Sequence, residues 1–98
     1  MLCAHTVRRL KPGSYDEFVE RFVPGDESVP AGWVRFHVLR SLSDENEVIT
    51  FGFFDGTLEE LESSQVDHGY EERRTRANAF VDDVVVNGVF EIAHEMVA

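Results

Sequence analysis

Basic residues are scarce in this sequence. Nine lysines and arginines stand against nineteen aspartates and glutamates, which gives a formal net charge of −10. Nucleic-acid binding requires a basic surface that displaces phosphate counterions, and anionic membranes attract the same kind of surface. We therefore expect neither a nucleic-acid partner nor a membrane partner.

Cysteine and long apolar runs are scarce as well. Cys3 is the only cysteine, so no disulfide forms within the chain, and this favours a reduced, cytoplasmic setting. No stretch approaches the roughly 20 apolar residues of a transmembrane helix. Glycine-rich nucleotide motifs and the GxSxG nucleophile elbow are missing, and we expect no cofactor.

The residues that are present suit one small domain over 1–98. Of the 98 residues, 43% are hydrophobic and 29% are charged, a balance typical of a globular chain with a single core. Turn and breaker residues separate the segments, with a loop over 24–32. Periodicity predicts strands over 2–9, 33–42, 47–54 and 84–96, and helices that begin after Ser14, after Thr57 and at Tyr70.

Local signals mark several boundaries of these elements. Ser14 and Thr57 each precede a glutamate by three residues, which is the spacing of a capping box. Asn87-Gly88 interrupts the last strand as either a hairpin turn or a bulge. We favour the bulge, because a hairpin would leave two very short arms.

The order of elements is β-α-β-β-α-β, counting the second helical region as one. It predicts the ferredoxin-like α+β fold, a four-stranded antiparallel sheet with its helices on one face. In the third strand, Ile49, Phe51 and Phe53 point to one face, and Val48 and Phe54 point to the other. Strands that are apolar on both faces are usually covered on both. We therefore predict a homodimer in which two sheets pack face to face.

These features resemble the dimeric α/β-barrel superfamily, and within it the antibiotic-biosynthesis-monooxygenase-like domains. The resemblance covers nearly the whole chain and rests on pattern rather than on one diagnostic motif. The segments that carry it are Lys11-Pro12-Gly13, Gly32-Trp33, Leu39-Arg40-Ser41 and Phe51 to Thr57.

The resemblance implies a homodimer with a pocket in each subunit between sheet and helices. It also implies a function among cofactor-independent monooxygenases, haem-degrading enzymes and other small-molecule enzymes. Many relatives have a tryptophan near the end of the third strand, where this chain has Phe53-Phe54. Many carry a histidine in or after the second helix, for which His68 is the counterpart. The first strand lacks the asparagine of the haem-degrading members, so that activity is not expected.

The second strand carries the strongest candidate site. Trp33, Arg35 and His37 alternate along it, and regular alternation places all three side chains on one face. A histidine in a pocket acts as a general base, and an arginine or an indole N–H steadies an anion. The alternative is structural: Trp33 anchors a core or an interface, and Arg35 pairs with a surface acid.

Further candidates lie on the helices. His68 is a second candidate for the catalytic base beside His37. Tyr15 and Tyr70 lie on the inward faces of their helices and are candidates for substrate binding, or pack in the core with the hydroxyl at its rim. The four histidines, His5, His37, His68 and His94, have no short ligand spacing such as HxH or HExxH, so we expect no metal site.

Two functions remain open from the sequence. The first is a small cofactor-independent monooxygenase-like enzyme that acts on an aromatic or polyketide-like molecule, with His37 or His68 as base and Trp33, Arg35, Tyr15 and Tyr70 binding the substrate. The alternative is a non-catalytic dimeric domain that binds a small molecule or a protein partner. An open pocket with convergent polar groups would favour the enzyme.

Overall fold

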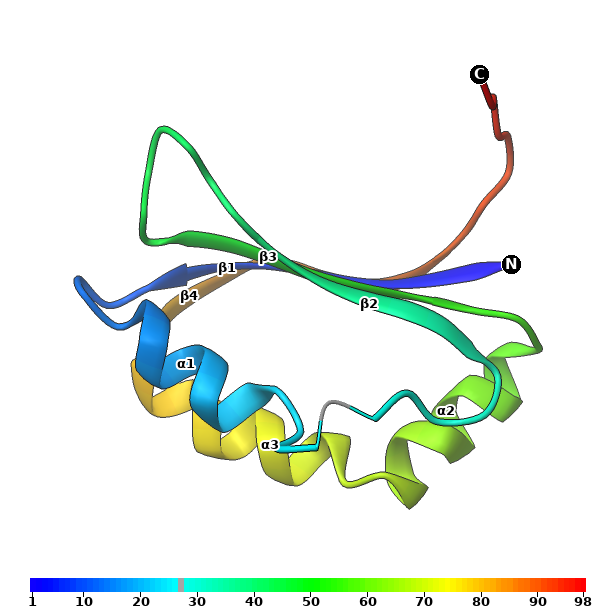
Figure 1. The fold of residues 1–98 in the computed structure, drawn as a ribbon, viewed down its shortest axis with the longest axis horizontal. Coiled ribbons are helices and arrows are strands. Elements are labelled where there is room, and N and C mark those ends of the chain that lie inside the picture. The colour runs from blue at the N-terminus through cyan, green and yellow to red at the C-terminus, as the bar shows by residue number, and fades with distance from the viewer. Residues whose placement is uncertain (27) are drawn as a thin grey trace.

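A four-stranded antiparallel sheet carries all the helices on one face (Figure 1). The computed structural model describes residues 1–26 and 28–98; Glu27, in the predicted loop 24–32, lies outside the described residues. The strand order β2-β3-β1-β4 confirms the predicted ferredoxin-like fold. The elements are β1 (Leu2–Leu10), α1 (Tyr15–Phe22), β2 (Trp33–Arg40), β3 (Glu47–Phe54), α2 (Leu58–Asp67), α3 (Tyr70–Ala77), the 3-10 turn η1 (Asn78–Phe80) and β4 (Val81–Glu91).

The two predicted capping boxes have different outcomes. Thr57 begins α2 with a complete box: its hydroxyl accepts from the backbone N–H of Glu60 at 3.2 Å, and the Glu60 carboxylate accepts from the N–H of Thr57 at 3.1 Å. Ser14 precedes α1 but its side chain makes no capping hydrogen bond. The Ser14 box was therefore a wrong prediction, because its spacing is present without the extended backbone that Thr57 adopts.

Strand β3 alternates as predicted. Val48, Thr50 and Phe54 are buried against the helices, whereas Phe51 and Phe53 are half-buried on the opposite face. The helix-covered side holds two groups of buried apolar side chains. One contains Leu10, Phe18, Val48 and Ala77, and the other contains Trp33, Phe54 and Leu61.

A β-bulge at Val34 corrects the predicted geometry of β2. Trp33 pairs with Phe54, while Arg35 pairs with Phe53, so Val34 has no partner of its own. The extra residue turns Trp33 toward the helices while Arg35 and His37 point to the opposite face. The prediction that Trp33, Arg35 and His37 share one face was therefore wrong.

Strand β4 also differs from its prediction. It ends at Glu91 rather than at Met96, and the chain then leaves the sheet as an extended tail (Figure 1). Asn87 and Gly88 pair regularly with β1 and form neither a bulge nor a hairpin; the register shifts lie at Val85 and at Asp82 instead. The tail has apolar residues but no neighbouring strand among the described residues, because β1, the one partner of β4, begins at Leu2 opposite Glu91.

No helix within residues 1–26 and 28–98 combines the length and apolar character needed to cross a membrane.

Candidate functional site

A cavity of about 690 Å³ lies on the helix-covered side of the sheet, within the range of small-molecule sites. Strands β1, β2 and β3 and all three helices contribute to its lining. A second cavity of about 420 Å³ toward β4 shares Ala4, Thr6, Gln65 and Tyr70 with it. The residues of the larger cavity that matter below are Phe22, Trp33, Phe36, Thr50, Ser64, His68, Tyr70 and Arg73.

Two neighbouring aromatic rings, tilted against each other, form one wall of this cavity. The ring centroids of Trp33 and Phe36 lie 4.7 Å apart. Gly52 on β3 makes room for them, because a Cβ at that position would lie 2.6 Å from the Phe36 ring and 3.0 Å from the indole. The indole Nε1–H of Trp33 donates to the hydroxyl of Ser64 at 2.9 Å, which ties the indole to α2. The wall is therefore aromatic, with its indole held in place, and it suits an aromatic ligand.

His68 and Tyr70 flank the junction between α2 and α3. Gly69 between them has φ +68°, a backbone conformation that favours glycine. His68 is exposed at the cavity rim, and Tyr70 is half-buried. Arg73 holds the junction in place, since it donates to the carbonyl oxygen of His68 and, at 3.2 Å, to that of Phe22.

Arg8 lies beneath the cavity and was not singled out by the sequence. Its side chain is only 2% exposed, and its Nη1 donates to the hydroxyl of Thr50 at 2.7 Å. The guanidinium lies over the rings of Phe22 and Phe18, at 4.8 and 5.4 Å from their centroids. Burial lowers the pKa of Arg8 from its ordinary value, and the neighbouring Tyr70 hydroxyl raises it in part. The sequence pattern could have predicted this burial, because Arg8 lies two residues before Leu10 on β1 and so shares its buried face.

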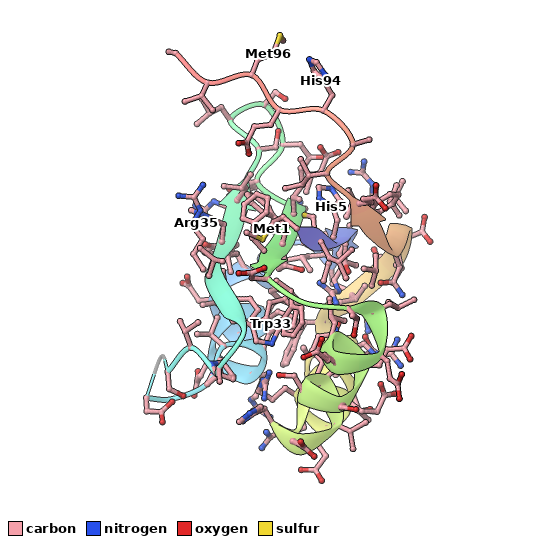
Figure 2. The ribbon with its side chains drawn as sticks, turned by 90° about the vertical axis from the view of Figure 1, so that its right-hand side faces the viewer. Met1, His5, Trp33, Arg35, His94 and Met96 are labelled. Carbon is pink, nitrogen blue, oxygen red and sulfur yellow. The ribbon has the colours of Figure 1, made fainter. Side chains whose placement is uncertain are left out.

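The remaining candidates lie elsewhere. Figure 2 shows Trp33 between the sheet and the helices, whereas Arg35 points outward from β2. Arg35 lies over the Phe53 ring at 5.3 Å on the face without helices. His37 contributes to the cavity rim from the edge strand, but its ring stacks on Phe51 at 4.9 Å on the far face.

Tyr15 packs against the core that contains Phe18, with the guanidinium of Arg40 at 4.1 Å over its ring, and is not part of the cavity lining. The structure thus brings Trp33, His68 and Tyr70 together at one cavity and keeps Tyr15, Arg35 and the His37 ring away from it. No group of three or more histidine, cysteine or acidic side chains in the described part of the chain is arranged to hold a metal ion.

Solved structures share this architecture over nearly the full chain. A "putative antibiotic biosynthesis monooxygenase" from Nitrosomonas europaea has a TM-score of 0.79 at 14% identity, covering 96% of this chain and 100% of that one. A protein of the same description from Chloroflexus aurantiacus has a TM-score of 0.76 at 15% identity, covering 97% and 95%. The fold is that of the antibiotic-biosynthesis-monooxygenase-like domains.

The same fold occurs in a conserved protein from Methanosarcina mazei, with a TM-score of 0.77 at 11% identity over 91% of this chain and 89% of that one. No protein-family model matches the sequence, and no curated protein does. At these identities the likeness concerns the fold, and function has to be argued from the cavity.

Proposed function

We propose that this protein is a cofactor-independent, monooxygenase-like enzyme that oxidises an aromatic or polyketide-like small molecule in the larger cavity. The observation that carries the proposal is the convergence of an aromatic wall, Trp33 and Phe36, with His68 and Tyr70 on one cavity of about 690 Å³. The names of the solved structures that share the fold support the same reaction class.

The proposed reaction converts a phenol or anthrone to a quinone with dioxygen as the oxidant. The substrate loses a proton to His68, and the resulting anion gives an electron to dioxygen. Recombination forms a carbon–oxygen bond, and loss of water leaves a new carbonyl group, so one oxygen atom enters the product and the other leaves as water. Tyr70 donates to the substrate oxygen, and Trp33 stacks on the ring.

His68 suits the role of base better than His37 does. His68 lies at the cavity rim beside Tyr70, whereas the His37 ring stacks on Phe51 on the opposite face of the sheet. Arg35 and Tyr15 take no part in the proposed reaction, because Arg35 points outward and Tyr15 packs in the core beneath Arg40.

Oxygen uptake with quinol and anthrone substrates tests this proposal. We expect His68→Gln to lower kcat by roughly 10²-fold or more, the usual contribution of a general base. His94→Gln is the matched control, since His94 is exposed on the tail after β4 (Figure 2). Full turnover in His68→Gln, or no oxygen uptake by the wild-type protein with any substrate of this class, would overturn the assignment.

We further propose that a second copy covers the face of the sheet without helices. That face carries a continuous apolar area, and such areas mark interaction sites. Phe90 is 49% and Leu39 44% exposed on it, and Phe51 and Phe53 lie between them. A twofold arrangement covers the same area on both copies at once.

The second candidate function is a non-catalytic dimeric domain that binds a small molecule. It is favoured by the exposure of His68, because an exposed imidazole is not held in a water-excluded site as catalytic bases often are. Binding of an aromatic ligand in the cavity without oxygen uptake would select this function over the enzyme.

A further inference from the structure

Arg8 is a buried cation for which the described part of the chain supplies no acidic partner. The ion pairs there join Arg9 to Asp44 and Glu47, and Arg74 to Glu71. Arg8 is 2% exposed, its Nη1 donates to the Thr50 hydroxyl, and its other polar neighbour is the hydroxyl of Tyr70. Arginine is almost never fully buried unless it is paired, because removing a charge from water is costly. Burial of Arg8 without an acidic partner therefore points to a ligand that supplies the missing negative charge.

The groups in contact with Arg8 face the larger cavity. Thr50, Tyr70 and Phe22 all touch or neighbour its guanidinium and all line that cavity. The Thr50 oxygen accepts from Arg8, so the hydroxyl hydrogen of Thr50 is free to donate elsewhere. A hydroxyl polarised in this way by a buried cation is a strong donor to an anionic oxygen.

The cavity lining lacks the acidic excess of the chain. The chain carries a net charge of −10. Among the described residues that line the larger cavity, however, one acid, Asp26, is balanced by one arginine, Arg73. The surface of this acidic protein repels anions, whereas the cavity, with buried Arg8 beneath it, opposes them much less.

We propose that the Thr50 hydroxyl, backed by Arg8, is an anion-binding group, and that the ligand of the cavity is an aromatic carboxylate. The aromatic part stacks on Trp33, and the carboxylate accepts from the Thr50 hydroxyl. Arg8 is a positioning residue, because it acts through the Thr50 hydroxyl and does not touch the ligand. This inference rests on the proposed function in one respect, the occupation of the cavity by an aromatic molecule.

A matched pair of probes tests the proposal. 2-Naphthoate and 2-naphthamide have nearly the same shape and differ in charge. Trp33 is the sole tryptophan, so a ¹⁵N-labelled sample gives one indole N–H signal, and that group lies in the cavity wall. We expect this signal to shift with both probes, and the carboxylate to bind roughly tenfold or more tightly than the amide.

Variants separate an anion-binding role from a structural one. Arg8→Met and Thr50→Val are expected to bring the affinity ratio of the two probes to about one, while Arg8→Lys keeps part of it. Arg76→Met is the control, an exposed arginine on α3 that is expected to keep the full ratio. Spectral dispersion confirms the fold of each variant, and Arg8→Lys and Thr50→Val keep the test available if Arg8→Met does not fold.

Each outcome decides between the inferences. A ratio near one in the wild-type protein, a full ratio in both Arg8→Met and Thr50→Val, or no shift of the Trp33 signal with either probe overturns the anion site. Charge selectivity without oxygen uptake keeps the anion site and overturns the enzymatic function. Oxygen uptake with neutral phenols, without charge selectivity between the probes, keeps the enzymatic function and overturns the anion site.

Discussion

Arg8→Met is expected to make the unliganded protein more stable. The cost of a lone buried ion is several kcal/mol after relaxation. Two contributions offset it: the charge-assisted hydrogen bond to Thr50, about 1.5–3 kcal/mol, and the cation–π contacts with Phe18 and Phe22, up to about 2 kcal/mol where desolvated. Methionine retains the apolar contact with both rings. We therefore expect the free energy of unfolding to rise by about 1 kcal/mol.

Thermal unfolding followed by circular dichroism measures this change. For a chain of this size, 1 kcal/mol corresponds to a rise in Tm of about 4–8 °C. All samples are compared at one protein concentration, because self-association also raises Tm. Arg76→Met, at an exposed site, is expected to change stability by no more than about 0.5 kcal/mol. A fall in Tm for Arg8→Met would refute the reasoning, since the guanidinium would then stabilise the fold through Thr50 and the two rings.

Two further predictions concern pH dependence and assembly. The backbone N–H of Asn46 and the Arg9 guanidinium lower the pKa of Asp44 below its ordinary value of 3.8. The folded state therefore gains stability from this carboxylate above that pH and loses it as the pH falls through the lowered pKa. We expect the Tm of wild-type protein to fall more steeply on acidification than that of Asp44→Asn, and parallel curves would exclude this contribution. Phe51→Glu, in the face without helices, is expected to convert a dimer to a monomer in sedimentation equilibrium. Leu42→Glu, in the exposed turn between β2 and β3, is the control, and a dimer that survives Phe51→Glu would show that this face is not the interface.

The parts of the fold that were predicted correctly depend on neighbours close in the chain. The capping box of Thr57 and Glu60 is complete within one helical turn. The alternation of β3 is the period-two pattern that a strand with one covered face shows. The turn between β2 and β3 follows from its length, and the register of that hairpin runs regularly from Phe36 to Arg40.

The parts that were missed depend on partners distant in the chain. The bulge at Val34 is defined by the pairing of β2 with β3, where Val34 has no opposite residue. The sequence of β2 alone does not show the register of its partner strand. The segment after Glu91 contains strand-forming residues but lies outside the sheet. Arg8 was missed because arginine side chains mostly lie in solvent, whereas helices α1 and α3 pack over this end of β1 with Phe18 and Tyr70.

The bulge at Val34 has a consequence for how the length of this chain can vary. Were Val34 paired regularly, Trp33 would share the face of Arg35, and the cavity would lose its aromatic wall. Removal of Val34, by contrast, would leave Trp33 opposite Phe54 and Arg35 opposite Phe53, their present partners. A one-residue deletion elsewhere in β2 would turn every side chain between the deletion and one end of the strand to the opposite face of the sheet. Position 34 is thus the point in this strand where a one-codon deletion is compatible with an intact cavity, and where strands of different length can evolve around the same site.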